Sequence, residues 1–251
     1  METIQIEITE FIHHCKYEKH LSSKTIKAYC TDLAQFTKFL LEKNLSVEVV
    51  GITKSEIRGF LEAISTLKPK SIKRKIATIK AMFNYLEFED KILINPFRKM
   101  RIKIQEPKQL PKVMDIREVN SILKLAYRKN ISCDFSSFSY MESLRNILVI
   151  ELLFATGARV SEIADLREEN INISSGAIII KGKGNKERII QICNIETLKI
   201  LKQYHERFNE KIKNANGFFL INRLGKKLSD QSIRNIVKNL AVESKIQKHI
   251  R

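Results

Sequence analysis

The sequence predicts a mainly helical protein that carries one small antiparallel sheet of three strands. Apolar residues recur at helical spacing through most of the chain, and short runs of strand length are confined to residues 171–192. A stretch that contains two of the four prolines separates two regions. We therefore expect a helical domain at residues 1–104, a linker at 105–112 and an α+β domain at 113–251.

The composition favours a polyanionic partner. Lys and Arg number 45 against 28 Asp and Glu, which gives a net charge of +17 and points to nucleic acid before an anionic membrane. The excess occurs in both halves, with 19 basic and 12 acidic residues in 1–104 and 26 and 16 in 105–251. The sequence contains no apolar run of about 18 residues and no signal-peptide pattern, so we expect a cytoplasmic protein without a membrane partner.

The first region reads as four or five short helices. Residues 4–12 keep helical spacing, and Ser22-Ser23 offers an N-cap for a helix over 25–42. Thr53 and Glu56 have the spacing of a capping box at the start of the next helix. Pro69 precedes a helix over 70–88, and Asn95-Pro96 ends the region. Because no strand pattern interrupts them, these helices predict a small bundle.

Residues 68–80 form the most basic window of this region and contain no acid. On a helix, Lys70, Lys73, Arg74 and Lys80 can share an outward face while the isoleucines point inward. Such a face suits contact with a phosphate backbone, and we expect Lys75 to join it. Taken alone, this window could also be an ordinary solvent-exposed helix face instead of a DNA-binding face.

The second region begins with a helix that Asp115 caps and continues through a Ser-rich loop at residues 130–140. An apolar helix over 144–155, expected at the centre of the core, ends where Gly157 can take the left-handed conformation. After it we expect a short helix at 160–166, strands at 171–173, 177–181 and 188–192, an extended step at 218–221, and helices at 195–208 and 231–244.

The sequence gives little support for a nucleotide-binding site or a metal site. The turn GKGNKE at 182–187 lacks the spacing of a nucleotide-binding P-loop, and no helix follows it directly. The four cysteines lie far apart and the histidines form no cluster, so a metal site is not expected. We therefore expect neither a metal nor another cofactor.

Two boxes at this separation, ATGARVSEIADLREENIN at 155–172 and IIIKGKGNKERIIQI at 178–192, closely resemble the catalytic domain of the tyrosine recombinases, the phage-integrase and Xer family. The stretches SSKTIKAYCTDLAQFTKFL and KSIKRKIATIKAMFNYL look like that family's helical, SAM-like core-binding domain. The resemblance covers essentially the whole chain. It implies site-specific recombination of double-stranded DNA through a 3′-phosphotyrosyl intermediate, by proteins that assemble as tetramers on paired sites.

The resemblance also implies roles for single residues. Arg159 matches the arginine that clamps the scissile phosphate, and Glu162 matches the acid that supports it. Lys183 matches the hairpin lysine that protonates the leaving 5′-oxygen. A planar guanidinium suits two phosphate oxygens, and a lysine among cations can supply a proton. The residues expected to contact DNA are Lys70, Lys73, Arg74, Lys75, Lys80, Lys186, Arg188, Arg234 and Lys238.

The chain departs from the family pattern at its end. The HxxR box, a later His or Trp and the nucleophilic tyrosine are not found; His249 and Arg251 have HxR spacing, which we interpret as the lead-in to that box. Tyr204 is the only tyrosine after Arg159, and its place directly after the hairpin argues against a nucleophile. We therefore expect a C-terminally truncated recombinase that binds DNA without cutting it. The alternative is a non-catalytic DNA-binding protein that occupies recombination sites.

Overall fold

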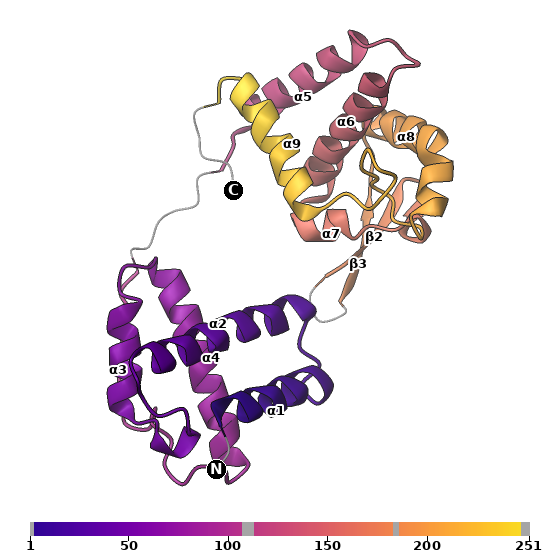
Figure 1. Ribbon diagram of the computed structural model, residues 1–251. Helices are drawn as coiled ribbons and strands as arrows, with labels where there is room; N and C mark the ends of the chain where they lie inside the picture. The colour runs from indigo at the N-terminus through magenta and orange to yellow at the C-terminus, as the bar shows by residue number, and fades with distance from the viewer. Residues whose placement is uncertain (1–2, 107–112, 183–185, 247–251) are drawn as a thin grey trace. The chain divides into compact units, whose positions relative to one another are not determined.

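Two units make up the chain, Met1–Gln109 and Leu110–Arg251. The computed structural model describes residues 3–106, 113–182 and 186–246 (Figure 1). Most of the expected linker at 105–112 falls outside these ranges, and each unit is treated by itself below. Within the described residues the predicted fold class is confirmed, because helices dominate and the strands form one three-stranded antiparallel sheet.

Local signals set the helix starts of the N-terminal unit as the sequence predicts. Ser22 Oγ accepts a hydrogen bond from Thr25 N, and Glu56 Oε2 accepts one from Thr53 N at 2.7 Å in a capping box. Pro69 occupies the first turn of its helix. The elements are α1 (Ile4–Tyr17), α2 (Ser23–Glu42), the 3₁₀ turn η1 (Val49–Gly51), α3 (Lys54–Ala63) and α4 (Pro69–Phe88).

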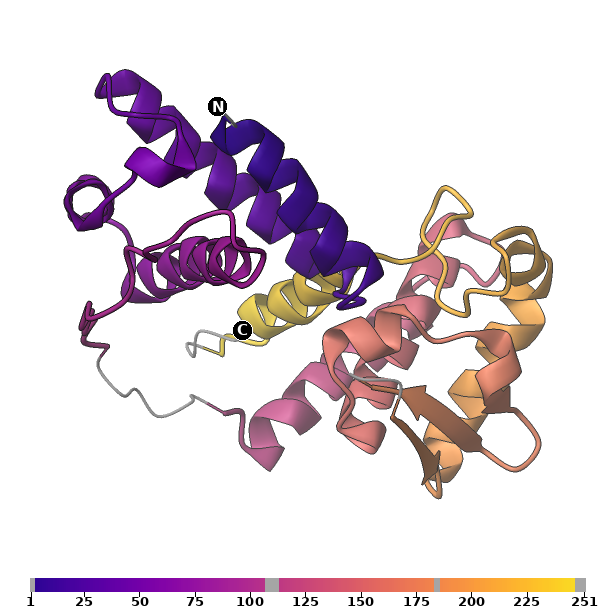
Figure 2. The same cartoon turned by 90° about the horizontal axis from the view of Figure 1, so that it is seen from below.

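The core of this unit lies where α1, α2 and α4 contact one another, and α1 and α2 run side by side (Figures 1 and 2). Aromatic rings fill it. Phe36 and Phe60 meet edge to face with ring centroids 5.1 Å apart, and Phe11 and Phe83 are almost fully buried. This packing fixes α2 against α4, the two helices that carry the charged cluster discussed below.

The C-terminal unit is built around one apolar helix. Leu144, Leu148 and Leu152 are fully buried, and their helix contacts four others, as expected for a central helix. The elements are α5 (Ile116–Ile131), α6 (Phe138–Thr156), α7 (Val160–Ala164), η2 (Glu168–Asn170), β1 (Ile171–Asn172), β2 (Ala177–Lys181), β3 (Glu187–Gln191), α8 (Ile195–Asn214) and α9 (Asp230–Glu243).

Two boundaries differ by more than two residues from expectation. The loop before α6 is shorter than residues 130–140, because Ser137 Oγ accepts a hydrogen bond from Tyr140 N and starts the helix there. The helix α8 continues past residue 208 to Asn214, since Ile212 still faces the core. Both differences concern the ends of elements, where sequence signals are weakest.

The sheet has the order β1-β2-β3, with β3 at one edge. Ile178 lies opposite Ile190 and Ile180 lies opposite Arg188. Ile178 and Ile180 are buried, so Arg188 occupies a position on the inward face of its strand. Among the described residues, no helix is long and apolar enough to cross a membrane.

Candidate active site

The site begins at the C-terminal end of α6. Gly157 takes φ +58°, and its N–H donates to Leu153 O at 3.1 Å, which closes the helix as the sequence predicts. Thr156 Oγ1 donates to Leu152 O and accepts from Ala158 N. These bonds close the helix and turn the chain, so that Arg159 follows directly after a hydrogen-bonded helix end.

Arg159 is the N-cap residue of α7 and is bonded twice to Glu162. Its backbone N–H donates to Glu162 Oε2 at 3.0 Å, and its Nη1 donates to Oε1 at 2.9 Å. The Glu162 side chain is 6% exposed, whereas the Arg159 side chain is 75% exposed. A buried carboxylate therefore fixes one edge of a guanidinium whose remainder faces solvent.

A second guanidinium reaches the same carboxylate. Arg188 Nη2 on β3 donates to Glu162 Oε2 at 2.8 Å. The sequence reasoning treated Arg188 only as a surface contact to DNA and missed this bond. The strand alternation carried a signal, because a basic residue on the inward face of a strand needs an acidic partner.

The electrostatics of this cluster favour an ionised carboxylate. The hydrogen bond from Arg188 lowers the pKa of Glu162 most, the backbone and side-chain bonds from Arg159 lower it further, and burial opposes them; the resulting pKa is about 2. Two guanidinium groups against one carboxylate leave a net positive charge, which suits an anion such as a phosphate group.

The hairpin passes close to this cluster. Gly182 N donates to Lys186 O at 2.7 Å, and a Cβ on Gly182 would lie 3.5 Å from Glu162 Oε1. Lys181 pairs loosely with Glu187 at 3.7 Å, and Lys186 is exposed. Lys183, the expected proton donor, lies outside the described residues.

Tyr204 is a core residue. Its side chain is fully buried, its hydroxyl donates to Phe219 O at 3.2 Å and accepts from Ile221 N at 2.9 Å, and burial raises its pKa. Such a hydroxyl is a poor nucleophile, in agreement with its place in the sequence. His249 and Arg251 lie outside the described residues.

The basic window on α4 is only partly presented to solvent. Lys70 and Lys73 lie 3.5 and 3.1 Å from carboxylate oxygens of Glu106, and Lys80 is exposed. Arg74 is 47% exposed and bonds to Asp32.

The expectation that Lys75 contacts DNA is wrong for the structure as it stands. Its side chain is 6% exposed, and its Nζ lies 3.0 Å from Asp32 Oδ1. The helical period places Lys75 on the inward side next to Ile72, Ile76 and Ile79, and Asp32 supplies the counterion there.

The remaining expected DNA contacts lie on α9. Arg234 and Lys238 are exposed and four residues apart, so they share one face of the helix. That arrangement is compatible with their expected role, which stays a prediction.

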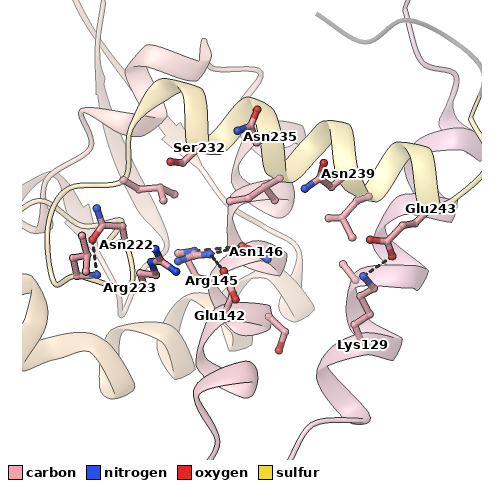
Figure 3. Close-up of a pocket in the computed structure, with 16 residues that line it drawn as sticks. Lys129, Glu142, Arg145, Asn146, Asn222, Arg223, Ser232, Asn235, Asn239 and Glu243 are labelled. Carbon is pink, nitrogen blue, oxygen red and sulfur yellow. Dashed lines mark hydrogen bonds and ion pairs between the residues drawn. The ribbon is translucent and has the colours of Figure 1, made fainter.

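A separate cavity of about 450 Å³ lies between α5, α6, α9 and residues 222–228 (Figure 3). Arg145 lines it, but its guanidinium donates to Glu142 Oε1 and Asn146 Oδ1, both at 2.9 Å. Within the described residues this cavity shares no lining residue with the Arg159 cluster. Across the same residues, no three His, Cys, Asp or Glu side chains converge as a metal-binding group.

Comparison with protein families gives two matches. The model described as "Phage integrase family" matches residues 112–251, and "Phage integrase, N-terminal SAM-like domain" matches residues 8–90. A tyrosine recombinase of Agathobacter rectalis is 40% identical over 251 residues, covering 100% of this chain and 80% of the relative. Tyrosine recombinase XerD of Listeria innocua is 33% identical, with 97% and 80% covered.

Solved structures share the fold at low identity. A lambda integrase tetramer bound to a Holliday junction superposes with a TM-score of 0.68 at 16% identity, covering 100% of this chain and 69% of that one. The XerH recombinase bound to a palindromic difH substrate, a post-cleavage complex, gives a TM-score of 0.69 at 19% identity, covering 97% and 69%.

Proposed function

This chain belongs to the phage integrase family of tyrosine recombinases, and on that basis we propose that it binds double-stranded DNA at recombination sites and serves site-specific breakage and rejoining. In the reaction that we propose for the family site, a tyrosine forms a 3′-phosphotyrosyl link and releases a 5′-oxygen. The link conserves the energy of the phosphodiester bond, so the proposal includes no nucleotide and no metal.

Arg159 is proposed to clamp the scissile phosphate. The observation that carries this assignment is the arrangement of Arg159, Glu162 and Arg188, in which an exposed guanidinium is held by a buried, ionised carboxylate. Phosphodiester cleavage gathers negative charge on the nonbridging oxygens, and a planar guanidinium can bind two of them at once. Because Glu162 already fixes Arg159, little reorganisation is needed when the phosphate arrives.

Lys183 is proposed as the acid for the leaving oxygen. Support comes from the base of the hairpin, where Gly182 approaches Glu162 so closely that a Cβ would stand 3.5 Å from Oε1. A lysine on this hairpin would have Arg159 and Arg188 near its base, and neighbouring cations lower a lysine pKa.

We further propose that these 251 residues bind DNA without cutting it. The C-terminal unit contains three tyrosines, and the hydroxyls of two of them are occupied: Tyr204 binds Phe219 and Ile221, and Tyr127 donates to Glu151 at 2.8 Å. The third, Tyr140, is buried. None of these side chains is placed as an attacking group, which supports a binding role without strand cleavage.

The test uses the full chain and a fluorescently labelled duplex. We expect binding that weakens steeply between about 50 and 200 mM salt, because Lys and Arg displace counterions from phosphates. On a nicked suicide duplex we expect no covalent protein–DNA adduct on a denaturing gel. A covalent adduct would overturn the claim that these residues do not cleave, and affinity independent of salt would overturn the DNA-binding claim.

One experiment separates this proposal from a non-catalytic protein that merely occupies recombination sites. The chain is extended with a family segment that carries the HxxR box and the tyrosine. A recombinase site then forms an adduct that Arg159→Ala abolishes while most DNA binding remains. A pure DNA binder forms no adduct with either version.

A further inference from the structure

We propose that Asp32 is a positioning residue for DNA binding by the N-terminal unit. Its buried carboxylate holds the Arg74 guanidinium at the surface of α4 in an orientation that receives a phosphate. This inference rests on the proposed function, because it takes the DNA backbone as the ligand. The proposal adds an acidic residue to the DNA-binding surface of α4, which charge alone would assign only to lysines and arginines.

Asp32 lies on α2, is fully buried, and accepts three hydrogen bonds from α4. Its Oδ2 accepts from Arg74 Nη1 at 2.6 Å and from Thr78 Oγ1 at 3.2 Å, and its Oδ1 accepts from Lys75 Nζ at 3.0 Å. A buried carboxylate is costly unless it is paired and hydrogen-bonded. Both oxygens are therefore bonded to α4, and these bonds hold the carboxylate of α2 in place against that helix.

The two cations that meet Asp32 differ in exposure. Lys75 is 6% exposed and also donates to Gln35, so it is a buried counterion of the Asp32 carboxylate. Arg74 is 47% exposed. One carboxylate against two cations leaves one positive charge, and the group open to solvent is the guanidinium. Its bond through Nη1 uses one of five N–H donors, which leaves others for phosphate oxygens.

The exposed lysines on the same helix are held in a different way. Lys70 and Lys73 both contact Glu106, whose side chain is 28% exposed. A phosphate that binds these lysines competes with Glu106 for the same Nζ groups. Arg74 can bind a phosphate and keep its bond to Asp32, because the fork of a guanidinium serves two acceptors. The half-buried Glu106 therefore competes with DNA for its lysines, whereas the buried Asp32 orients the guanidinium that meets DNA.

Substituting Asp32 separates positioning from simple electrostatics. If only charge matters, Asp32→Asn removes a negative charge near a phosphate-binding face and strengthens DNA binding. If Asp32 positions Arg74, the same substitution frees the guanidinium and weakens binding. The two accounts predict opposite signs for one variant.

The experiment is a double-mutant cycle in the full chain, with Kd for a random-sequence duplex measured by fluorescence anisotropy between about 50 and 200 mM NaCl. Arg74→Ala is expected to weaken binding by about tenfold and to lower the salt slope by about 1. Asp32→Asn is expected to weaken binding about three- to tenfold alone, and not further when Arg74 is already alanine.

Several outcomes overturn the proposal. Tighter or unchanged binding by Asp32→Asn does so, and so does equal weakening in both Arg74 backgrounds, which indicates a general loss of structure. The matched control is Glu106→Gln, an acid outside α4 that pairs with Lys70 and Lys73 of that helix and whose loss is expected to tighten binding. If the wild-type chain shows no salt-dependent binding, the proposed function itself fails, a result distinct from any failure of the cycle.

A second variant keeps the test open if Asp32→Asn is unfolded at the assay temperature by circular dichroism. Arg74→Lys retains the charge and one donor for Asp32 but loses the planar fork. We expect an unchanged salt slope and binding weakened several-fold. Affinity equal to that of the wild type would overturn the proposal.

Discussion

Arg188 Nη2 lies 2.8 Å from Glu162 Oε2, and this hydrogen bond joins the edge strand β3 to α7. Glu162 Oε1 accepts at the same time from Arg159 Nη1 at 2.9 Å. One buried carboxylate thus sets the position of two guanidinium groups on two elements. The guanidinium of Arg159 and the base of the hairpin are therefore fixed relative to each other through one side chain.

Glu162→Gln should destabilise the C-terminal unit. The amide keeps the size of the side chain but replaces a charged acceptor with a group that turns N–H donors toward guanidinium donors. We expect a loss of about 1–3 kcal/mol in the free energy of unfolding, measured by urea titration. The matched control is Glu187→Gln, whose exposed pair with Lys181 should contribute less than about 0.5 kcal/mol. Equal effects of the two variants would contradict the assignment.

The contribution of Glu162 should depend on pH in a defined window. Its folded pKa of about 2 is below the ordinary value of 4.5, so between these two pH values the folded state binds fewer protons than the unfolded state. The stabilisation is complete above about pH 5 and is lost as pH falls through the range from about 4.5 to about 2. The stability difference between wild type and Glu162→Gln should shrink across that range. A difference that stays constant from about pH 7 to pH 3 would count against it.

Arg188→Ala should affect stability, unlike substitutions of Arg234 and Lys238, the exposed cations of α9 that are also expected to touch DNA. It removes the largest cause of the lowered Glu162 pKa and leaves that carboxylate with Arg159 alone. Arg188 is itself 41% exposed, so we expect a cost of only about 1–2 kcal/mol. Chemical denaturation and a DNA-binding titration should be run together.

Arg234→Ala is the control for that experiment. Arg234 is exposed on α9, so its loss should change stability by less than about 0.5 kcal/mol and lower the salt slope of DNA binding by about 1. If Arg188→Ala changes the free energy of unfolding as little as Arg234→Ala does, the hydrogen bond between Arg188 and Glu162 does not stabilise the fold.

The sequence was sufficient to predict local structure wherever the signal acts within one or two helical turns. The caps at Ser22 and Thr53, the left-handed Gly157 and the apolar run that becomes α6 were all predicted and are confirmed. Each depends on residues within about four positions, where backbone geometry alone sets the contact.

The sequence was insufficient to predict the partner of a charged side chain where that partner is distant in the chain. Lys75 was expected on the surface, but its partner Asp32 is 43 positions away on another helix. Arg188 was expected to meet DNA, and its bond to Glu162 spans 26 positions. Periodicity could place Lys75 on the inward side of α4 and Arg188 on the inward face of β3, but which acid each of them meets depends on tertiary packing.

Tyr204→Phe tests whether the only tyrosine after Arg159 has a structural role. The hydroxyl accepts from Ile221 N and donates to Phe219 O inside the core, so its removal leaves a buried N–H without that partner. We expect a loss of about 1–2 kcal/mol in the free energy of unfolding and no change in DNA affinity below the unfolding transition. The control is Tyr17→Phe, since Tyr17 is 53% exposed and should be nearly neutral. A folded Tyr204→Phe variant that loses DNA binding would show that the hydroxyl acts on the ligand rather than on the core.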